Sequence, residues 1–325
     1  MKKIALRTLI SLAFIGLLIY LVREDIPQVI NALRNINRPL LALSVLISLT
    51  TVLILSKRLQ LIFAAEDVKI RFSEAAHLSF IGYFFNNFLP TSVGGDIVKV
   101  MCASRITGNA VKSVTSVLMD RIFGLFTFVL IPSVSLLFFI KQIKNPAVPA
   151  IIYSFMGLSL FFFFLLFNRN VARKFSFIEV ALNYFHLGKK ARSIYDGLHN
   201  FKNHKGVVAQ AMLLSIIGQS VNILVLYFMA VALGVKADII YFYLLVPVVH
   251  LLSMLPSLNG LGIREGAYTY FLAPCLGREN AVALGLLWLG LLFLLSLIGG
   301  IIYLVRHDYH VQFKWKNVDR IADGV

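Results

Sequence analysis

The sequence contains few charged residues. Asp, Glu, Lys and Arg make up 14% of its 325 residues, against about 25% in an ordinary soluble domain. Hydrophobic residues make up 59%. A soluble protein of this composition would expose large apolar patches, and a disordered chain would contain fewer aromatic and aliphatic residues. Nucleic-acid binding would explain the net charge of +16 but not the scarcity of charge. The composition predicts an all-α, polytopic integral membrane protein with its charges in loops.

Cysteines and nucleotide-binding motifs are also scarce. Cys102 and Cys275 lie in or beside apolar runs, so they indicate neither a disulfide framework nor a metal cluster. His307 and His310 lack further ligands nearby, and a zinc site is not expected. The Gly-rich phosphate loops and the Gly-x-Ser-x-Gly motif are absent from the sequence. We therefore expect no cofactor, no metal and no ATP-driven pump within this chain.

Apolar runs predict about six full membrane spans. A crossing helix needs about 20 apolar residues, and the first run reaches that length only with Ile4–Leu6 included. No small-residue cleavage site follows that run, so we interpret it as a retained helix rather than a signal peptide. The predicted spans are 9–22, 39–56, 122–140, 145–167, 206–235 and 281–305.

Two apolar segments are interrupted by proline and glycine. Residues 86–96 read Asn-Asn-Phe-Leu-Pro-Thr-Ser-Val-Gly-Gly-Asp, and residues 254–262 read Met-Leu-Pro-Ser-Leu-Asn-Gly-Leu-Gly. Neither is expected to form a continuous helix. Non-helical backbone at membrane depth occurs only where protein or a wet cavity satisfies its polar groups. The sequence thus predicts two re-entrant or broken-helix hairpins.

The two interruptions align at an offset of 166 residues, which pairs Pro90 with Pro256 and Gly94 with Gly260. The loop 168–205 holds eight Lys and Arg against two acidic residues, which predicts a cytoplasmic loop, and both termini are assigned to the same side. The two halves then have opposite orientations, as in alternating-access transporters. The alternative is an accidental pair of kinks. The predicted parts are a first helix and exterior loop (1–38), repeat 1 (39–140), a linking span (145–167), a cytoplasmic amphipathic loop (168–205), repeat 2 (206–305) and a cytoplasmic tail (306–325).

Charged residues near the interruptions are the candidates for function. A carboxylate at membrane depth costs about 2.5–3.5 kcal/mol, so Asp96 is expected to be paired with Lys99, to cap the following half-helix or to act in transport. Asp120 and Arg121 are neighbours and should find different partners. Arg264 would meet a lipid phosphate or be neutralised by Glu265. The candidate substrate-binding residues are Asn87, Pro90, Thr91, Gly94, Gly95, Asp96, Lys99, Asp120, Arg121, Pro256, Ser257, Asn259, Gly260, Gly262, Arg264 and Glu265.

A basic segment before the second half has helical periodicity. Ala191, Ile194, Tyr195, Leu198 and Phe201 share one face of a helix over residues 191–202. We interpret this segment as an amphipathic helix on the cytoplasmic leaflet, where anionic lipids would attract its basic side chains. The alternative is a positive-inside loop without lipid specificity.

Three motifs resemble the lysylphosphatidylglycerol synthase transmembrane, or flippase-like, family. They are residues 87–96, Asp120-Arg-Ile-Phe-Gly-Leu125 and residues 255–266. The family includes YbhN-type proteins and the membrane half of the multiple peptide resistance factor, and the resemblance runs from about Leu6 to Val305. It implies a flippase-like lipid translocase for a polar or anionic lipid such as a phospholipid or a polyprenyl-phosphate-linked carrier, without the soluble synthase domain.

Two other function classes stay open on the sequence. One is an integral-membrane transferase with Asp96 or Asp120 as a general base, although the acidic residues are few and scattered. The other is a membrane scaffold for a lipid-modifying enzyme. We expect a multi-pass protein of a bacterial or archaeal plasma membrane. Its expected partners are membrane lipids, with a homo-oligomer or a lipid-biosynthesis enzyme as further candidates, and nucleic acid is not among them.

Overall fold

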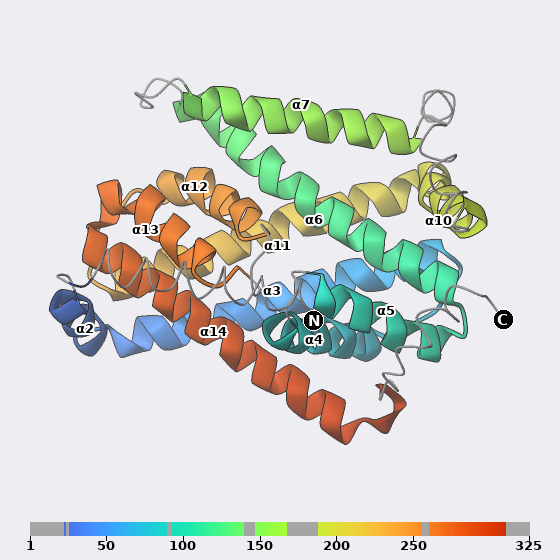
Figure 1. The fold of residues 1–325 in the computed structure, drawn as a ribbon, viewed down its shortest axis with the longest axis horizontal. Helices are drawn as coiled ribbons and strands as arrows, with labels where there is room; N and C mark the ends of the chain where they lie inside the picture. The colour runs from blue at the N-terminus through green and yellow to red at the C-terminus, as the bar shows by residue number, and fades with distance from the viewer. Residues whose placement is uncertain are drawn as a thin grey trace.

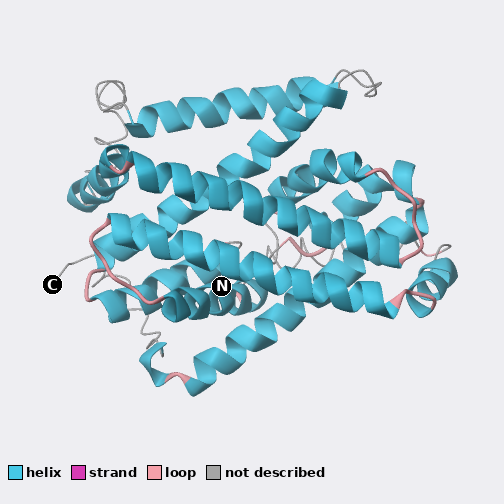
Figure 2. Ribbon diagram, turned by 180° about the vertical axis from the view of Figure 1, so that it is seen from behind, coloured by secondary structure: helices cyan, strands magenta, loops and turns pink. Residues whose placement is uncertain are grey.

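The structure is a computed structural model that describes residues 23, 26–89, 93–139, 147–167, 188–254 and 260–309. Within these residues the regular elements are helices, and no strand is present (Figure 2). In chain order they are α2 (Ile26–Arg34), α3 (Arg38–Ala65), α4 (Phe72–Phe88), α5 (Gly94–Thr107), α6 (Ala110–Phe139), α7 (Ala147–Phe167), α10 (Gly188–Asn200), α11 (Lys205–Ala232), α12 (Ile239–Leu252), α13 (Ile263–Leu276) and α14 (Arg278–Val305). The all-α prediction is confirmed.

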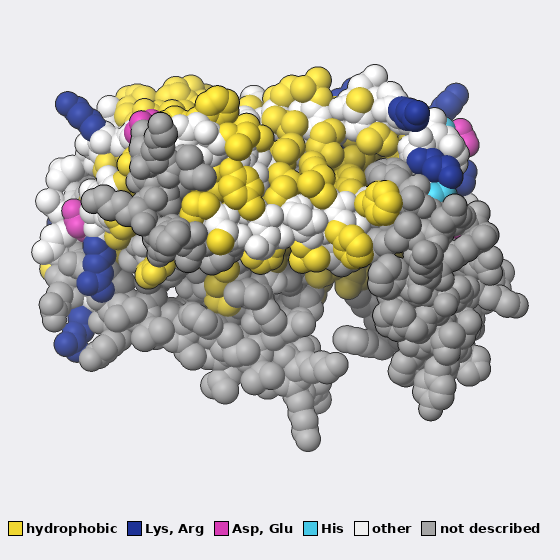
Figure 3. Space-filling view, turned by 90° about the horizontal axis from the view of Figure 1, so that it is seen from above, with side chains coloured by type: hydrophobic (Ala, Val, Ile, Leu, Met, Phe, Trp, Pro, Cys, Tyr) yellow, Lys and Arg dark blue, Asp and Glu magenta, His cyan; other side chains and the backbone are white. Residues whose placement is uncertain are grey.

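Four helices are long and apolar enough to cross a membrane, namely α3, α6, α11 and α14. Each has 28 or 30 residues, and at 1.5 Å per residue about 42–45 Å exceeds the hydrocarbon core of about 30 Å. Exposed apolar side chains form a belt between ends where Lys and Arg gather (Figure 3). The chain is therefore a multi-pass membrane protein.

The observed spans are longer than the charge-free runs that predicted them. The run 39–56 extends through Lys57 and Arg58 to Ala65, and the run 122–140 begins at Ala110 and includes Asp120 and Arg121. A search for charge-free runs ends a span too early when the charged residue is paired inside the bundle. The helix α7 covers most of the predicted span 145–167, whereas the predicted first span, 9–22, lies outside the described residues.

Two pairs of half-length helices enter the bundle from opposite ends (Figure 1). We call the end at α10 the α10 end and the end at α2 the α2 end. The helices α4 and α5 pack together, and both their outer termini lie at the α10 end. The helices α12 and α13 also pack together, and their outer termini lie at the α2 end. The inner termini of both pairs therefore point towards the middle of the molecule.

The order and lengths of the helices repeat along the chain. Shifted by 166 residues, α3, α4 and α6 fall on 204–231, 238–254 and 276–305, where α11, α12 and α14 occupy 205–232, 239–252 and 278–305. The packing repeats as well, because α4 contacts α14 and the matching helix α12 contacts α6. Both α3 and α11 lie between the halves and pack along each other.

The amphipathic segment forms α10, followed by a short 3-10 turn over Phe201–Asn203. Its apolar face packs on protein: Leu198 and Phe201 are buried in a cluster with Ile62, Met119 and Phe123. The interpretation that this face lies on the lipid leaflet is therefore wrong for Leu198 and Phe201. The bundle buries them because α3 and α6 offer apolar surface at the α10 end.

Candidate functional site

The first interruption is a close approach of α4 and α5. A Cβ added at Gly95 would overlap the carbonyl oxygen of Gly82 and would lie 2.6 Å from the Asn86 side chain, so only glycine fits there. The backbone N–H of Gly95 donates to Asn86 Oδ1 at 2.8 Å. Asn86 thus satisfies one of the free donors at the start of α5. Pro90 and Thr91, which lie between the two helices, fall outside the described residues.

Asp96 lies in the first turn of α5 and pairs with cations on two helices. Its carboxylate accepts a hydrogen bond from Arg121 Nη1 on α6, and Lys99 Nζ lies 3.7 Å from Asp96 Oδ1. The predicted pairing with Lys99 is confirmed, and Arg121 is an additional partner. Among the described residues it is Asn86, not Asp96, that accepts a free backbone N–H at the start of α5, and Asp96 binds side chains instead.

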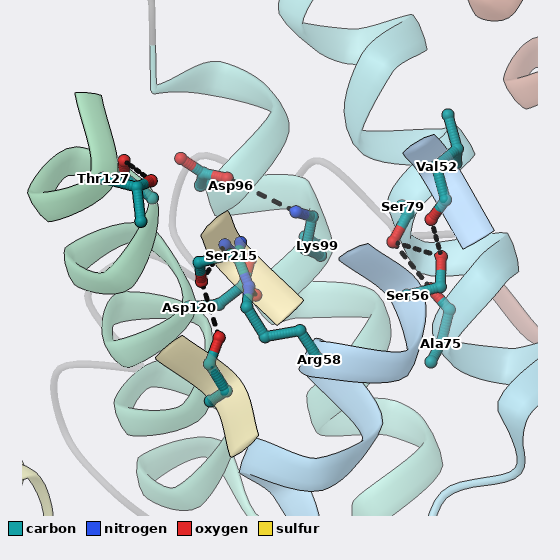
Figure 4. A network of polar contacts seen from close by, with 12 residues as sticks. Val52, Ser56, Arg58, Ala75, Ser79, Asp96, Lys99, Asp120, Thr127 and Ser215 are labelled. Carbon is teal, nitrogen blue, oxygen red and sulfur yellow. Dashed lines mark hydrogen bonds and ion pairs between the residues drawn. The ribbon is translucent and has the colours of Figure 1, made fainter. Parts of the chain in front are cut away.

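Asp120 faces the opposite way from Arg121, as expected for neighbours on a helix. Arg58 Nε on α3 donates to Asp120 Oδ1 at 2.7 Å, and Arg58 Nη1 donates to Ser215 Oγ on α11 at 2.9 Å (Figure 4). The side chains of Arg58 and Asp120 are only 6% and 12% exposed. One buried contact therefore joins α3, α6 and α11. Sequence reasoning missed Arg58, which follows Lys57 directly after the predicted span 39–56 and therefore looked like an ordinary basic end of a span.

The second interruption is shaped by glycines in the left-handed region. Gly260 and Gly262 have φ angles of +77° and +80°, which side chains with a Cβ rarely adopt. The backbone N–H of Gly262 donates to Glu265 Oε2 at 2.7 Å, which caps the start of α13. Arg264 Nε and Nη2 both donate to Glu265 Oε1, at 3.0 and 2.7 Å. Glu265 therefore neutralises Arg264, which is one of the two roles predicted for this pair from the sequence.

Asn87 connects the end of α4 to the middle of α14. Its Nδ2 donates to the carbonyl oxygen of Leu292 at 3.0 Å and to Ser296 Oγ, and Ser296 Oγ donates to the carbonyl oxygen of Tyr83 at 3.1 Å. Further along, Gly299 lets α14 approach the backbone of Phe80, because a Cβ at position 299 would overlap the Phe80 carbonyl oxygen. The first pair of half-length helices is thus held against the second half of the chain.

A cavity of about 210 Å³ lies between the two halves. Two buried polar atoms in its lining, Thr51 Oγ1 and Gln219 Nε2, have no hydrogen-bond partner among the described residues. Arg264 is the one charged side chain among the described lining residues, which contain no Asp or Glu. The lining is Ser48, Thr51, Leu55, Tyr83, Phe128, Gln219, Asn222, His250, Ser253, Met254, Arg264, Trp288, Leu291, Leu292 and Leu295.

The predicted site residues form two separate groups. Asp96, Lys99 and Arg121 lie together between α5 and α6, and Asp120 faces α3. Arg264 lines the central cavity, with Glu265 bound to it. Gly94, which opens α5, is buried beside Gly95. The structure does not describe Pro90, Thr91, Pro256, Ser257 and Asn259, so these candidates remain predictions.

Sequence reasoning missed most of the cavity lining. Thr51 on α3 and Gln219 on α11 lie within apolar runs that were interpreted as plain spans. His250 on α12 joins α13, because its Nε2 lies 3.1 Å from the hydroxyl of Tyr268. A single polar residue in a membrane span is common. Only the folded structure shows that polar residues from several helices line the same cavity.

Comparison with known protein families gives one result that covers most of the chain. The family model described as "Lysylphosphatidylglycerol synthase TM region" matches residues 4–300. No curated protein and no solved structure matches the chain significantly.

Proposed function

Because this chain belongs to the lysylphosphatidylglycerol synthase TM region family, we propose that it is a flippase-like lipid translocase. The substrate is a polar or anionic lipid, such as a phospholipid or a polyprenyl-phosphate-linked carrier. Its head group crosses through the protein while its acyl or prenyl tails stay in the bilayer. The protein is not an enzyme in this proposal, and its partners are membrane lipids.

The observation that carries the proposal is the ion pair between Asp96 on α5 and Arg121 on α6. Charged side chains are costly at membrane depth, so their presence at the inner end of a half-length helix indicates a functional site. A guanidinium offers two parallel donors that suit a phosphate as well as a carboxylate. An anionic head group can therefore replace Asp96 on Arg121 and loosen α5 from α6, with Lys99 nearby to balance the charge.

The repeated helix order supports an alternating-access mechanism. Helices related by the 166-residue shift run in opposite directions, and the two half-length pairs open to opposite ends (Figure 1). Inverted repeats that meet at broken helices are the usual architecture of secondary transporters. Rocking of the first half against the second would expose the central cavity to one end and then to the other.

The basic loop assigns the orientation. Residues 168–205 carry eight Lys and Arg, so the α10 end faces the cytoplasm and both termini lie on that side. The membrane is then the plasma (inner) membrane of a bacterium or archaeon. A test is the labelling of single cysteines placed at the two ends, with a reagent that does not cross the membrane.

The function is tested with purified protein in vesicles that contain a fluorescent phospholipid. Asp96→Asn and Arg121→Ala should abolish movement of the lipid between leaflets, because both remove the ion pair. Asp308→Asn is the matched control, since it makes the same chemical change in an exposed pair with Arg306. Full transport by both site variants would overturn the site assignment. A new lipid species detected by mass spectrometry in the same vesicles would favour the transferase instead.

A further inference from the structure

Thr51 differs from the other hydroxyl residues around it. On α3, Ser48 and Thr50 donate to the carbonyl oxygens of Val45 and Ile47, at 2.6 and 2.7 Å. The Thr51 hydroxyl makes no such bond, although the residue is 5% exposed. A buried polar group without a partner is costly, and such groups call for an explanation. Thr51 also lines the central cavity, so a ligand there that the hydroxyl reaches by rotating about χ1 would supply the missing partner.

Gln219 provides the second unpaired group from the opposite helix. Its Nε2 has no partner, the residue is 7% exposed, and it lines the same cavity from α11. Two unpaired groups on facing helices indicate one occupant that hydrogen-bonds to both. Asn222 and Ser253 add further groups that both donate and accept.

The charge of the cavity restricts the chemistry of that occupant. The Arg264 guanidinium is already neutralised by Glu265 through two hydrogen bonds. A phosphate bound here would therefore leave a net negative charge at membrane depth. An ammonium group would face the guanidinium and find no carboxylate among the described lining residues. An uncharged group avoids both penalties.

The size and the aromatic side chains of the lining fit a small hydroxylated group. The volume of about 210 Å³ lies below the roughly 300–1,000 Å³ of drug-sized ligand sites, so only a small group fits. Tyr83, Phe128 and Trp288 supply apolar surface, and a few amides and hydroxyls supply direction, which is the usual composition of a small-molecule site. Hydroxyl groups donate and accept, so they match the amides of Gln219 and Asn222.

We propose that this cavity binds an uncharged, hydroxyl-bearing group of the transported lipid, of glycerol to monosaccharide size. The proposal rests on the proposed function and adds a second contact to it, because Arg121 would hold a phosphate of the lipid and this cavity a hydroxylated part of the head group. Thr51 and Gln219 hydrogen-bond to the hydroxyls, and Arg264 contributes a donor whose charge Glu265 offsets.

Trp288 makes the binding measurable. The chain has two tryptophans, and Trp315→Phe leaves Trp288 in the cavity as the sole reporter. The protein is placed in phosphatidylcholine nanodiscs with increasing monoglucosyl-diacylglycerol, phosphatidic acid or lysyl-phosphatidylglycerol. We expect a saturable change of Trp288 emission with the glucosyl lipid, at least about ten-fold stronger in apparent affinity than with the other two. Equal or tighter binding of phosphatidic acid or of the lysyl lipid overturns the proposal.

Substitutions of similar shape test the two unpaired groups. Thr51→Val and Gln219→Leu should each weaken binding of the glucosyl lipid about ten-fold, which is the effect of one lost hydrogen bond of ordinary strength. Thr50→Val is the matched control and should bind as the parent does. Without the glucosyl lipid, both cavity variants should melt at or above the parent temperature, because each removes an unpaired polar atom. Unchanged binding, or a lower melting temperature, contradicts the assignment.

Transport assays separate this proposal from the proposed function. If vesicles containing the wild-type protein move none of the three lipids, the translocase function fails, whatever the nanodiscs show. If they move lipids but Thr51→Val moves the glucosyl lipid as fast as the wild type, the function stands and the cavity assignment fails.

Discussion

The two interruptions of the bundle occupy matching places in the order of helices but differ in charge pairing. At the first, two ion pairs join different helices: Asp96 on α5 binds Arg121 on α6, and Asp120 on α6 binds Arg58 on α3. At the second, Arg264 and Glu265 are adjacent on α13 and bind each other. The first set of contacts ties helices together, whereas the second leaves its helix connected mainly by packing and places an arginine in the lining of the cavity.

The difference shows that the helix order repeats but the chemistry does not. The 166-residue shift places Asp120 and Arg121 on Leu286 and Leu287, and it places Arg264 on Val98. The same order of helices therefore carries different charged residues in the two halves. We infer that the Arg58–Asp120 pair beside the first interruption contributes mainly to holding the helices, whereas Arg264 and Glu265 at the second contribute mainly to binding, and the predictions below test this division.

The largest effect should follow from breaking the Arg58–Asp120 pair. Asp120→Ala leaves the Arg58 guanidinium buried without its carboxylate, and removing one partner of a buried pair costs about 3–5 kcal/mol. Unfolding of the purified protein in detergent, followed by circular dichroism, measures the loss. If too little protein is obtained for this measurement, size-exclusion chromatography after heating ranks the stability of the variants by the fraction that still elutes as a monodisperse peak.

A double variant distinguishes the ion pair from general damage to α6. Arg58→Met together with Asp120→Ala removes both charges, so it should recover a large part of the stability lost by Asp120→Ala alone. If the two single changes add without any recovery, the pair does not hold α3 to α6 and the comparison between the two interruptions fails.

The second-largest loss of stability should follow from disturbing the close approach of α4 and α5. Gly95→Ala places a methyl group on the Gly82 carbonyl oxygen, and the helices must separate, at a cost of about 1–3 kcal/mol. Gly124→Ala on α6 is the control, because its Cβ would meet nothing closer than Arg58 at 3.9 Å. Since alanine favours a helix over glycine, that control should unfold at the same temperature or higher. Equal losses in the two variants would contradict the packing argument.

Much of the fold could be predicted because membrane residence leaves a strong signal in the sequence. Apolar runs located α3, α6, α11 and α14, and Pro-Gly interruptions located the ends of α4 and α12. The bounds were less accurate, because α3 and α6 continue through Arg58, Asp120 and Arg121. A charge that is paired across helices does not end a helix, and the partner is not visible in a single sequence.

The candidate site was predictable only in its charged parts. Asp96, Arg121 and Arg264 stood out because charge is rare in this chain. Thr51 and Gln219 did not, since one threonine or glutamine in a span usually bonds within its own helix. That both lack a partner follows from how α3 and α11 pack against each other, although Thr51 and Gln219 are 168 positions apart in the chain.

The second interruption should tolerate loss of its acidic charge better than the first. Glu265→Gln keeps an oxygen that accepts the Gly262 N–H, so the cap of α13 remains. Arg264 loses the charge of its partner, but the substitution keeps a polar side chain of the same size beside it, whereas Asp120→Ala removes the acceptor from Arg58 altogether. We expect a loss of about 1 kcal/mol, in the range of a weakened charge-assisted hydrogen bond. A loss as large as that of Asp120→Ala, in the same unfolding assay, would contradict the proposed division.

The smallest change in stability should come from Glu66, which follows the last residue of α3 at the α10 end. Burial raises the pKa of the Glu66 carboxyl above its ordinary value of 4.5, against the attraction of Lys112 and His204. The folded protein then binds this proton more tightly than the unfolded chain. The resulting stabilisation is complete below the unfolded pKa and is lost as the pH rises through the folded pKa. Glu66→Gln should therefore gain stability relative to the wild type as the pH rises from about 4.5. Asp308→Asn at an exposed position is the control, and parallel stability curves for Glu66→Gln and wild type across this range would show that Glu66 does not carry the effect.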